Sequence, residues 1–147
     1  MVVPIVVLDQ ISKFAAVKYL KGNNPYVIIE NFFQLDYVEN FGAAFGILQN
    51  KRIVFIIITS IVILGIIFFL AKHPDYLNRW MKIALVMLLG GTIGNFIDRV
   101  RQGYVIDFIS FRFGRGYDFP VFNVADIFIV TSTILIMILV LFNEYEV

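Results

Sequence analysis

The sequence predicts an all-α membrane protein, with four transmembrane helices and a small extramembrane β element between the first helix and the second. Hydrophobic residues make up 60% of the 147 residues and charged residues only 16%, with a mean hydropathy of +0.85, whereas soluble domains carry about a quarter charged residues. Several apolar segments approach the length of about 20 residues that a helix needs to cross a bilayer. One stretch between them is instead rich in aromatic and β-branched residues, which favour strands. We expect a single domain over 1–147, with spans at about 1–20, 53–71, 83–99 and 123–142 and the β element at about 26–50.

Charge and composition exclude several classes of function. The net charge of +1 gives no electrostatic reason to expect a nucleic-acid partner. The chain has no cysteine, which removes disulfides, thiolate nucleophiles and cysteine metal sites. Its one histidine, His73, lies in a polar stretch beside Pro74, so neither a histidine-based triad nor a metal site is expected. The N-terminus carries no basic region ahead of its apolar run, so we do not expect a cleaved signal peptide there.

The first predicted helix, 1–20, carries two opposite charges within an apolar segment. Asp9 and Lys13 are four residues apart and therefore share one face of a helix. They either form an internal ion pair that lets both charges enter the membrane, or they form one wall of a polar site. The spacing supports both interpretations equally.

The predicted β element begins after a polar turn at 21–25. Aromatic and aliphatic residues alternate with polar ones over 33–37, and this period of two predicts a strand. The segment 40–46 that follows is rich in glycine and alanine, which permit a close approach of the backbone. We therefore expect residues 21–52 to form a small folded element outside the membrane.

The second and third predicted helices differ in their polar content. The second, 53–71, contains no charged residue and is the clearest span. The third, 83–99, ends with Asn95, Asp98 and Arg99, which share a face because they are three and four residues apart. Ionisable residues at the edge of a membrane segment are costly and mark a candidate functional site.

Small residues in the third helix indicate close packing against neighbouring helices. Gly90, Gly91 and Gly94 lie just before the polar residues of that helix, and small residues let membrane helices approach one another. Residues 100–121 are expected to form an irregular loop, because glycine and proline interrupt its second half. The last span, 123–142, follows this loop.

Four spans place the segments 21–52 and 99–121 on one side of the membrane, and the loop 72–82 and both termini on the other. The distribution of lysine and arginine does not decide which side is cytoplasmic. In this arrangement Asp107 and Asp126 lie at the same membrane face, 19 residues apart. Two carboxylates held close together share a proton, so that one acts as a base and the other as an acid. Such a pair can hydrolyse a peptide by activating water and protonating the leaving amine.

Structural interpretations of the same residues compete with this hypothesis. Asn123 stands three residues before Asp126, which resembles a capping box at the start of the last helix. Asp107 could instead be a solvated loop carboxylate paired with a nearby arginine. Asp98 and Arg99 could be a local ion pair at the membrane interface.

Five blocks of the sequence, taken together, resemble the lipoprotein signal peptidases (signal peptidase II) of bacteria. They occur in order, with family-like spacing, over residues 9–126. The blocks are Asp9-Gln10-x-x-Lys13, Asn40-x-Gly42-Ala43-Ala44-Phe45, Gly90-Gly91-x-x-Gly94-Asn95-x-x-Asp98-Arg99, Val105-x-Asp107-Phe108 and Phe122-Asn123-x-Ala125-Asp126.

The resemblance implies an aspartyl endopeptidase of the bacterial inner membrane. Enzymes of this family have four spans and a β-cradle outside the membrane, with both termini cytoplasmic and the active site near the periplasmic surface. They remove signal peptides from prolipoproteins by cleaving just before a diacylglyceryl-modified cysteine. Their partners are these prolipoproteins and the membrane lipids; no cofactor and no metal is implied, and we expect a monomer.

The resemblance also assigns roles to residues of this chain. Asp107 and Asp126 match the catalytic dyad, and the segment 40–50 matches a mobile segment over the site. The positions that match substrate-binding or site-supporting residues are Asp9, Lys13, Asn40, Gly42, Asn95, Asp98, Arg99 and Asn123.

Two other classes of function, a transporter and a structural subunit, compete with a peptidase. A small transporter or channel would use the polar residues of the first and third helices as a pathway, but these residues gather toward one membrane face. A structural membrane subunit would need only capped helices and would leave the Asn-Phe-Gly-Ala-Ala-Phe block at 40–45 unexplained.

Overall fold

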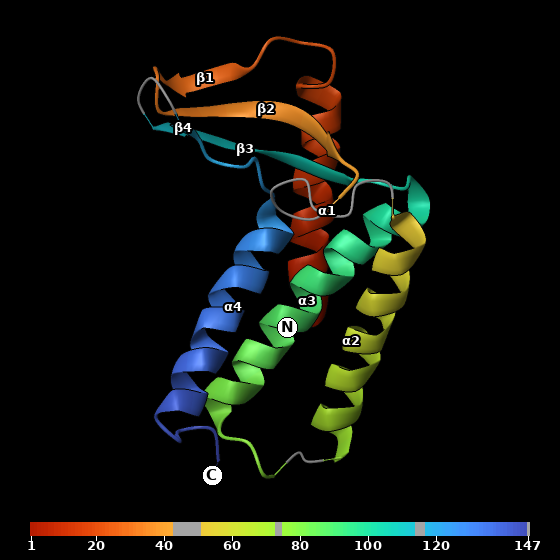
Figure 1. Ribbon diagram of the computed structural model, residues 1–147, viewed down its shortest axis with the longest axis vertical. Coiled ribbons are helices and arrows are strands. Elements are labelled where there is room, and N and C mark those ends of the chain that lie inside the picture. The colour runs from red at the N-terminus through yellow and green to blue at the C-terminus, as the bar shows by residue number, and fades with distance from the viewer. Residues whose placement is uncertain (43–50, 73–74, 114–116, 147) are drawn as a thin grey trace.

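The computed structural model describes residues 1–42, 51–72, 75–113 and 117–146, which form a bundle of helices with a β-sheet across one end (Figure 1). The helices are α1 (Val2–Tyr19), α2 (Arg52–Lys72), α3 (Arg79–Arg101) and α4 (Val124–Leu141). All four expected helices are present, and their bounds lie within a few residues of the expected ones. Part of the expected mobile segment, 43–50, lies outside the described residues.

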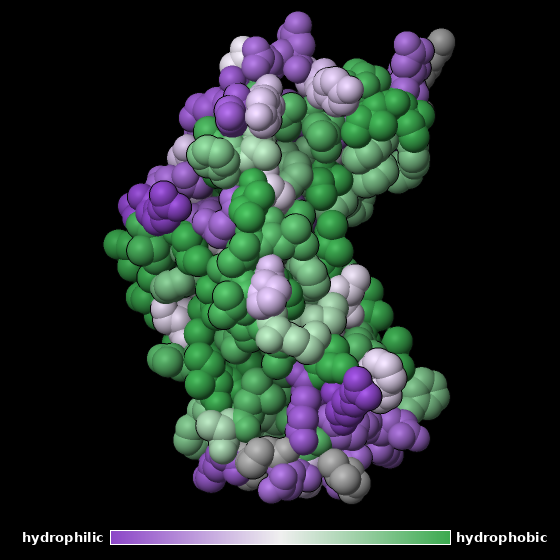
Figure 2. Space-filling model, turned by 180° about the vertical axis from the view of Figure 1, so that it is seen from behind, coloured by the Kyte–Doolittle hydropathy of each residue, from purple (hydrophilic) through white to green (hydrophobic). Residues whose placement is uncertain are grey.

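Three of these helices have the length and hydropathy of a membrane span. Among the described residues they are α2, α3 and α4, and the most hydrophobic part of α2 has no residue buried inside the protein. α1 carries Asp9, Lys13 and Lys18 within 18 residues and is not among these candidates. Figure 2 shows hydrophobic residues covering the middle of the molecule, with hydrophilic residues gathered toward both ends. This distribution is the one that a bilayer requires of a protein that crosses it.

α3 is the central helix, because it contacts α1, α2 and α4. Its glycines lie at the crossings, as the sequence predicted. A Cβ atom at Gly91 would overlap the carbonyl oxygen of Ala125 on α4, and a Cβ at Gly94 would overlap the carboxylate of Asp9 on α1. The absence of side chains at these positions brings the backbones of three helices together, where van der Waals contact holds membrane helices to one another.

Among the residues that the structure describes, the sheet has four antiparallel strands in the order β1-β2-β3-β4. They are β1 (Tyr26–Ile29), β2 (Phe33–Asn40), β3 (Val105–Phe113) and β4 (Tyr117–Asp118). β1 and β2 confirm the strands that were predicted within residues 26–50. Residues 104–113 were expected to be irregular, and that expectation is wrong: β3 is the longest strand and pairs with β2 along most of its length.

The physical reason for β3 lies in its composition. Six of the nine residues from Val105 to Phe113 are β-branched or aromatic, and they alternate with polar ones from Ile109 onward, which suits a pleated, partly buried surface. Gly103, with φ +89°, turns the chain out of α3, a conformation that other residues rarely adopt. The glycines and the proline that suggested a loop lie only beyond residue 113. The β element is therefore built from two distant segments and not from the first one alone.

The pairing of β2 with β3 places the segments that follow α1 and α3 at the same end of the bundle (Figure 1). A buried apolar cluster joins this sheet to α1, with Ala16 and Leu20 packed against Ile106 and Phe108. At the opposite end the segment before α3 contacts the C-terminal residues, where the amide of Asn78 donates to the carbonyl of Tyr145 at 3.0 Å. The N-terminus lies partway along the bundle in the same view.

Candidate active site

Two aspartates, from β3 and α4, meet where the sheet rests on the helices. Asp107 lies in the buried half of β3, and Asp126 lies in the first turn of α4. The side chain of Asn123, the N-cap of α4, donates to Oδ1 of Asp107 at 2.6 Å. At the end of β2, the side chain of Asn40 donates to Oδ2 of the same carboxylate at 2.8 Å. Both oxygens of Asp107 are therefore held by amide donors, one from a neighbouring strand and one from a helix cap.

Asp126 has both a capping role and a place in this cluster. Its Oδ2 accepts a bond from the backbone amide of Asn123 at 3.1 Å, and the side chain of Asn123 accepts from the amide of Asp126 at 2.9 Å. This reciprocal pair is the capping box that the sequence suggested, and it satisfies two amides of the helix N-terminus. The other oxygen, Oδ1, accepts a bond from the side chain of Asn95 on α3 at 2.7 Å. The structural interpretation of Asp126 is therefore correct but incomplete.

Burial separates the environments of the two carboxyl groups. Asp107 is only 2% exposed, whereas Asp126 is partly exposed. Burial raises the pKa of Asp107 to about 7, and the negative charge of Asp126 adds to the rise, while the bonds from Asn40 and Asn123 oppose it. At neutral pH Asp107 therefore holds a proton for a large part of the time. The competing interpretation of Asp107 as a solvated loop carboxylate is wrong.

A buried lysine, Lys13, contacts the residues that hold the two aspartates in place. Lys13, 2% exposed, places its Nζ 2.9 Å from Oδ2 of Asp9, 2.8 Å from Oδ2 of Asp98 and 2.8 Å from Oδ1 of Asn95. An ammonium group has three N–H donors, and these three acceptors use all of them. Both interpretations of Asp9 and Lys13 are therefore correct. The two residues form an ion pair within the protein, and Lys13 also donates to Asn95 in the cluster of polar residues around the aspartates. Asp98 forms its ion pair with Lys13, so the interpretation of Asp98 and Arg99 as a local ion pair is wrong.

Lys13 also determines the orientation of the Asn95 amide. Because Lys13 can only donate, the atom that faces it must be the oxygen of Asn95. The nitrogen of Asn95 must then face Asp126, to which it donates. The same oxygen accepts a second bond from Asn123 at 3.2 Å. The orientation of the Asn95 amide in the cluster is therefore fixed by its neighbours.

The aspartate of the same ion pair also holds α4 in place. Oδ1 of Asp9 accepts a bond from the backbone amide of Ala125 at 2.9 Å, one residue before Asp126. This amide belongs to the first turn of α4, where no carbonyl of the helix is available to it. The first helix therefore positions the residue that carries the second carboxylate.

The remaining predicted residues join the cluster through the backbone at the end of β2. The amide of Gly42 donates to Oδ1 of Asn40 at 2.9 Å, and its carbonyl accepts from Nη2 of Arg99 at 3.2 Å. The guanidinium of Arg99 lies over the ring of Phe55 on α2, 4.7 Å from its centroid, a favourable cation–π geometry. Through these contacts the structure connects all ten predicted site residues in one network.

Two further residues belong to the surroundings of this site, and the sequence analysis did not assign them a role. The side chain of Gln10 donates to Oδ1 of Asp98 at 3.0 Å and to the carbonyl of Gly94 at 3.3 Å. Arg52 donates to the carbonyls of Arg99 and Val100 at 2.8 and 2.7 Å and so binds the C-terminal carbonyls of α3. Gln10 stood inside one of the motifs, one residue after Asp9. Arg52 gave no signal beyond its place at the edge of a span.

The chemistry available to this arrangement is that of a carboxyl pair. No group of three or more histidine, cysteine, aspartate or glutamate side chains that could hold a metal ion occurs among the described residues. What the cluster offers is one buried carboxyl group with a pKa near neutrality beside a more exposed one. Such a pair can take a proton from water and deliver one to a leaving group.

Comparison with known proteins places the whole chain beside one group of enzymes. Residues 1–142 match the family model described as signal peptidase (SPase) II. A lipoprotein signal peptidase of Caldanaerobacter subterraneus is 51% identical over 140 residues, covering 95% of this chain and 92% of the relative. One from Clostridium tetani is 39% identical and covers 96% of this chain and 90% of its own. Two solved structures, each described as a bacterial membrane enzyme, superpose with TM-scores of 0.87 and 0.82 at 38% and 39% identity, covering 97% and 95% of this chain and 86% and 89% of theirs.

Proposed function

Since this chain belongs to the signal peptidase II family, we propose that it is an aspartic endopeptidase that removes signal peptides from prolipoproteins in a bacterial membrane. The observation that carries the proposal is the pairing of Asp107 and Asp126 through Asn123 and Asn95. Cleavage takes place just before a cysteine that carries a diacylglyceryl group. The enzyme acts as a monomer and uses no cofactor or metal.

The two carboxyl groups take different roles in this mechanism. Asp126, which is partly exposed, is ionised and accepts a proton from a water molecule as the water oxygen attacks the scissile carbonyl carbon. Asp107, whose pKa lies near neutrality, donates its proton to the carbonyl oxygen. When the tetrahedral intermediate collapses, the C–N bond breaks, the oxygen returns its proton to Asp107 and Asp126 delivers its proton to the leaving amine. The pair ends with one proton, as it began.

The supporting residues hold the two carboxyl groups in fixed positions. Asn40 and Asn123 fix the plane of the Asp107 carboxyl group, and Asn95 fixes one oxygen of Asp126. The ion cluster around Lys13 orients Asn95 and anchors α4. Arg99 and Gly42 hold the end of β2 over the site. Preorganised donors of this kind contribute to catalysis because they need no rearrangement as charge develops.

The membrane arrangement that we propose has four spans. α2, α3 and α4 supply three of them, and α1 supplies the fourth by neutralising its charges within the protein: Asp9 and Lys13 are paired and buried. Both termini then face the cytoplasm, and the sheet with the dyad faces the outer, periplasmic side.

Cleavage by single variants tests the proposal. We expect Asp107→Asn and Asp126→Asn each to lower the cleavage of a diacylated prolipoprotein by at least about a thousandfold, because members of a catalytic unit fail together. The purified variants in detergent, with product sizing by gel or mass spectrometry, provide the measurement. Asp75→Asn is the matched control: Asp75 is exposed near the opposite end of α3, and its variant should cleave at the native rate. Native-like turnover by either dyad variant contradicts the mechanism.

A further inference from the structure

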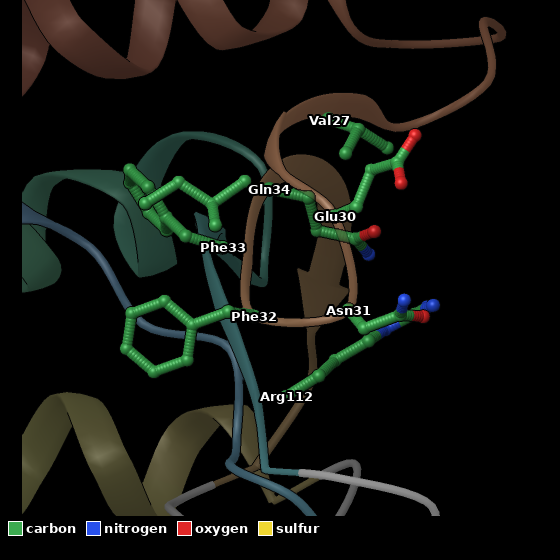
Figure 3. Close-up of a pocket in the computed structure, with 8 residues that line it drawn as sticks. Val27, Glu30, Asn31, Phe32, Phe33, Gln34 and Arg112 are labelled. Atoms are coloured by element: carbon green, nitrogen blue, oxygen red, sulfur yellow. The ribbon is translucent and has the colours of Figure 1, made fainter.

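A second site lies at the β1–β2 turn, away from the aspartate pair. A cavity of about 290 Å³ opens there, with polar walls from Glu30, Asn31, Gln34 and Arg112 (Figure 3). Asn31 has a φ of +58°, a left-handed conformation that asparagine tolerates in turns. The backbone amide of Arg112 donates to the carbonyl of Phe32 at 2.8 Å and ties the turn to β3. The walls of the cavity are therefore formed by the sheet itself.

The wall of this cavity contains a buried donor without a partner. Gln34 is 5% exposed, and its Nε2 has no hydrogen-bond partner in the part of the chain that the structure describes. A buried donor that is left unsatisfied destabilises a protein, so buried polar groups are nearly always paired. A ligand oxygen in the cavity would satisfy this donor. Figure 3 shows the Gln34 amide directed toward the space between Glu30 and Arg112.

The charges around Gln34 define the chemistry of that ligand. A guanidinium group and an amide donor together favour a phosphate oxygen. Glu30, on the other side of Gln34 (Figure 3), offers a carboxylate that can accept from an ammonium group. A phosphodiester with a primary amine a few ångströms away, as in phosphoethanolamine, meets both charges at once.

The surroundings of the cavity favour a lipid over a free anion. The four residues of β1, Tyr26, Val27, Ile28 and Ile29, are 48–65% exposed although all are apolar or aromatic. Hydrophobic residues cover this end of the sheet in Figure 2, at the upper right. Exposed apolar surface of this extent marks an interaction site. A phospholipid would place its headgroup in the cavity and its glycerol and upper acyl carbons on β1.

The distance from the dyad makes this site independent of cleavage. Gln34 and Asn40 lie on the same strand, six residues apart, which corresponds to roughly 20 Å along the strand. We propose that the cavity between the β1–β2 turn and Arg112 binds the headgroup of an amine-bearing phospholipid and so fixes the sheet on the membrane surface. This goes beyond the proposed peptidase activity and does not depend on it.

Binding of a short-chain lipid to the full chain in nonionic detergent tests the proposal. Dihexanoyl-phosphatidylethanolamine is titrated by calorimetry and compared with dihexanoyl-phosphatidylglycerol, which lacks the amine, and with inorganic phosphate. We expect saturable binding of the ethanolamine lipid, about fivefold or more weaker binding of the glycerol lipid, and at least tenfold weaker binding of phosphate. Glu30→Gln should remove the preference between the two lipids, because it removes the group that meets the amine.

Variants of the cavity provide the decisive comparison. Gln34→Met should weaken binding of the ethanolamine lipid at least tenfold, while the free variant unfolds at the same or a higher temperature because the orphan donor is gone. Arg112→Gln should also weaken binding. Arg79→Gln is the matched control, since Arg79 is exposed at the other end of the bundle and its variant loses the same charge. Asp107→Asn should bind the lipid as the native chain does, whatever its peptidase activity.

Three outcomes would overturn the proposal. Native-like lipid binding by Gln34→Met would show that the lipid lies elsewhere. Equal affinity for inorganic phosphate would reduce the cavity to an adventitious anion site. Displacement of the lipid by a soluble, unlipidated peptide of a prolipoprotein would assign the cavity to the polypeptide substrate instead.

Discussion

At the scale of single residues, the site depends on three asparagines that act as oriented donors. Asn40, Asn95 and Asn123 each give an amide N–H to one of the two carboxyl groups. Aspartate at any of these positions would fill the same space but would present a third carboxylate to the pair. Asparagine is therefore the residue type that can both bridge and separate two acids of like charge.

The rate of cleavage should depend on pH through Asp107. Burial, together with the negative charge of Asp126, raises the pKa of Asp107 to about 7. The mechanism requires a proton on Asp107, and that proton is lost as the pH rises through this pKa. We expect kcat/KM to fall about tenfold per pH unit above that point. A pH–rate profile with a diacylated prolipoprotein measures it.

A variant can assign this alkaline limb to Asp107. The hydrogen bond from Asn40 opposes the rise of the pKa of Asp107, so Asn40→Ala should move the limb to higher pH even if the maximal rate falls. Asn24→Ala, at an exposed position in the turn after α1, should leave the profile unchanged. A limb that does not move in Asn40→Ala would mean that a different group titrates.

At the scale of elements, the sequence predicted the helices far better than the second half of the sheet. Long uncharged segments such as 53–71 leave little choice in a membrane, because only a helix satisfies its own backbone there. β3 has no such constraint, and its pairing with β2 depends on residues 65 to 78 positions away in the chain, from Asn40 with Val105 to Phe33 with Phe111. The glycines and the proline near residue 115 also favoured a loop, and the alternation of polar and apolar residues is short, over 109–113 only. Local pattern cannot report a partner strand that lies this far along the chain.

The candidate site was more predictable than the strand that carries half of it. Spacing alone put Asp9 with Lys13 and Asn95 with Asp98 on common helix faces, and the structure confirms the first of these as an ion pair. Spacing could not show that Asn123 reaches Asp107, because that contact crosses from a helix cap to a strand. The resemblance to a family assigned Asn123 to the residues that support the site, and the structure supplies its contact with Asp107.

The crossing of α3 with α4 should be intolerant of a single added methyl group. Gly91→Ala would place a Cβ against the carbonyl of Ala125 and the side chain of Ile129, so we expect a loss of about 1–3 kcal/mol in the free energy of unfolding. Cleavage should fall as well, because Ala125 adjoins Asp126. Thermal unfolding and the cleavage assay, both in detergent, provide the measurements.

Gly65→Ala is the matched substitution for this test. Gly65 lies on α2 with nothing near its would-be Cβ, and alanine is favoured over glycine in a helix by about 1 kcal/mol. This variant should be as stable as the native chain or more so, with unchanged cleavage. If both variants behave alike, helix propensity and not the crossing determines the effect.

At the scale of the whole molecule, the sheet and the loop 72–82 should be on opposite sides of the membrane. The pairing of β2 with β3 requires both of their segments to share one side. Single cysteines at Asn24 and Phe119, both exposed, should react with an impermeant reagent added to intact spheroplasts, and one at Asp75 should not. The chain has no native cysteine, so no background reaction is expected. Labelling of Asp75Cys together with the other two would contradict the four-span arrangement.

Substrate selection should depend on the lipid of the substrate. The dyad that we propose lies between the sheet and the first turn of α4. The diacylglyceryl group would fix the depth and orientation of the cleavage site, which is a contribution of positioning. A prolipoprotein without this group, or with serine in place of the cysteine, should remain uncut in the same membrane, as judged by product size. Comparable cleavage of the unlipidated precursor would indicate a general intramembrane aspartic protease.

The order in which ribosomes deliver the two halves of the sheet has its own consequence. Asn40 and Asp107, which are hydrogen-bonded in the finished protein, are separated by 67 positions in the chain. At about 5–20 residues per second, synthesis leaves β2 without β3 for roughly 3–13 s. During that time one edge of β2 exposes unpaired backbone groups, and such an edge can pair with other chains. The aspartate pair that we propose as the catalytic centre cannot assemble before the third helix and the segments after it have been made, so a nascent molecule should have no peptidase activity until its translation is nearly complete.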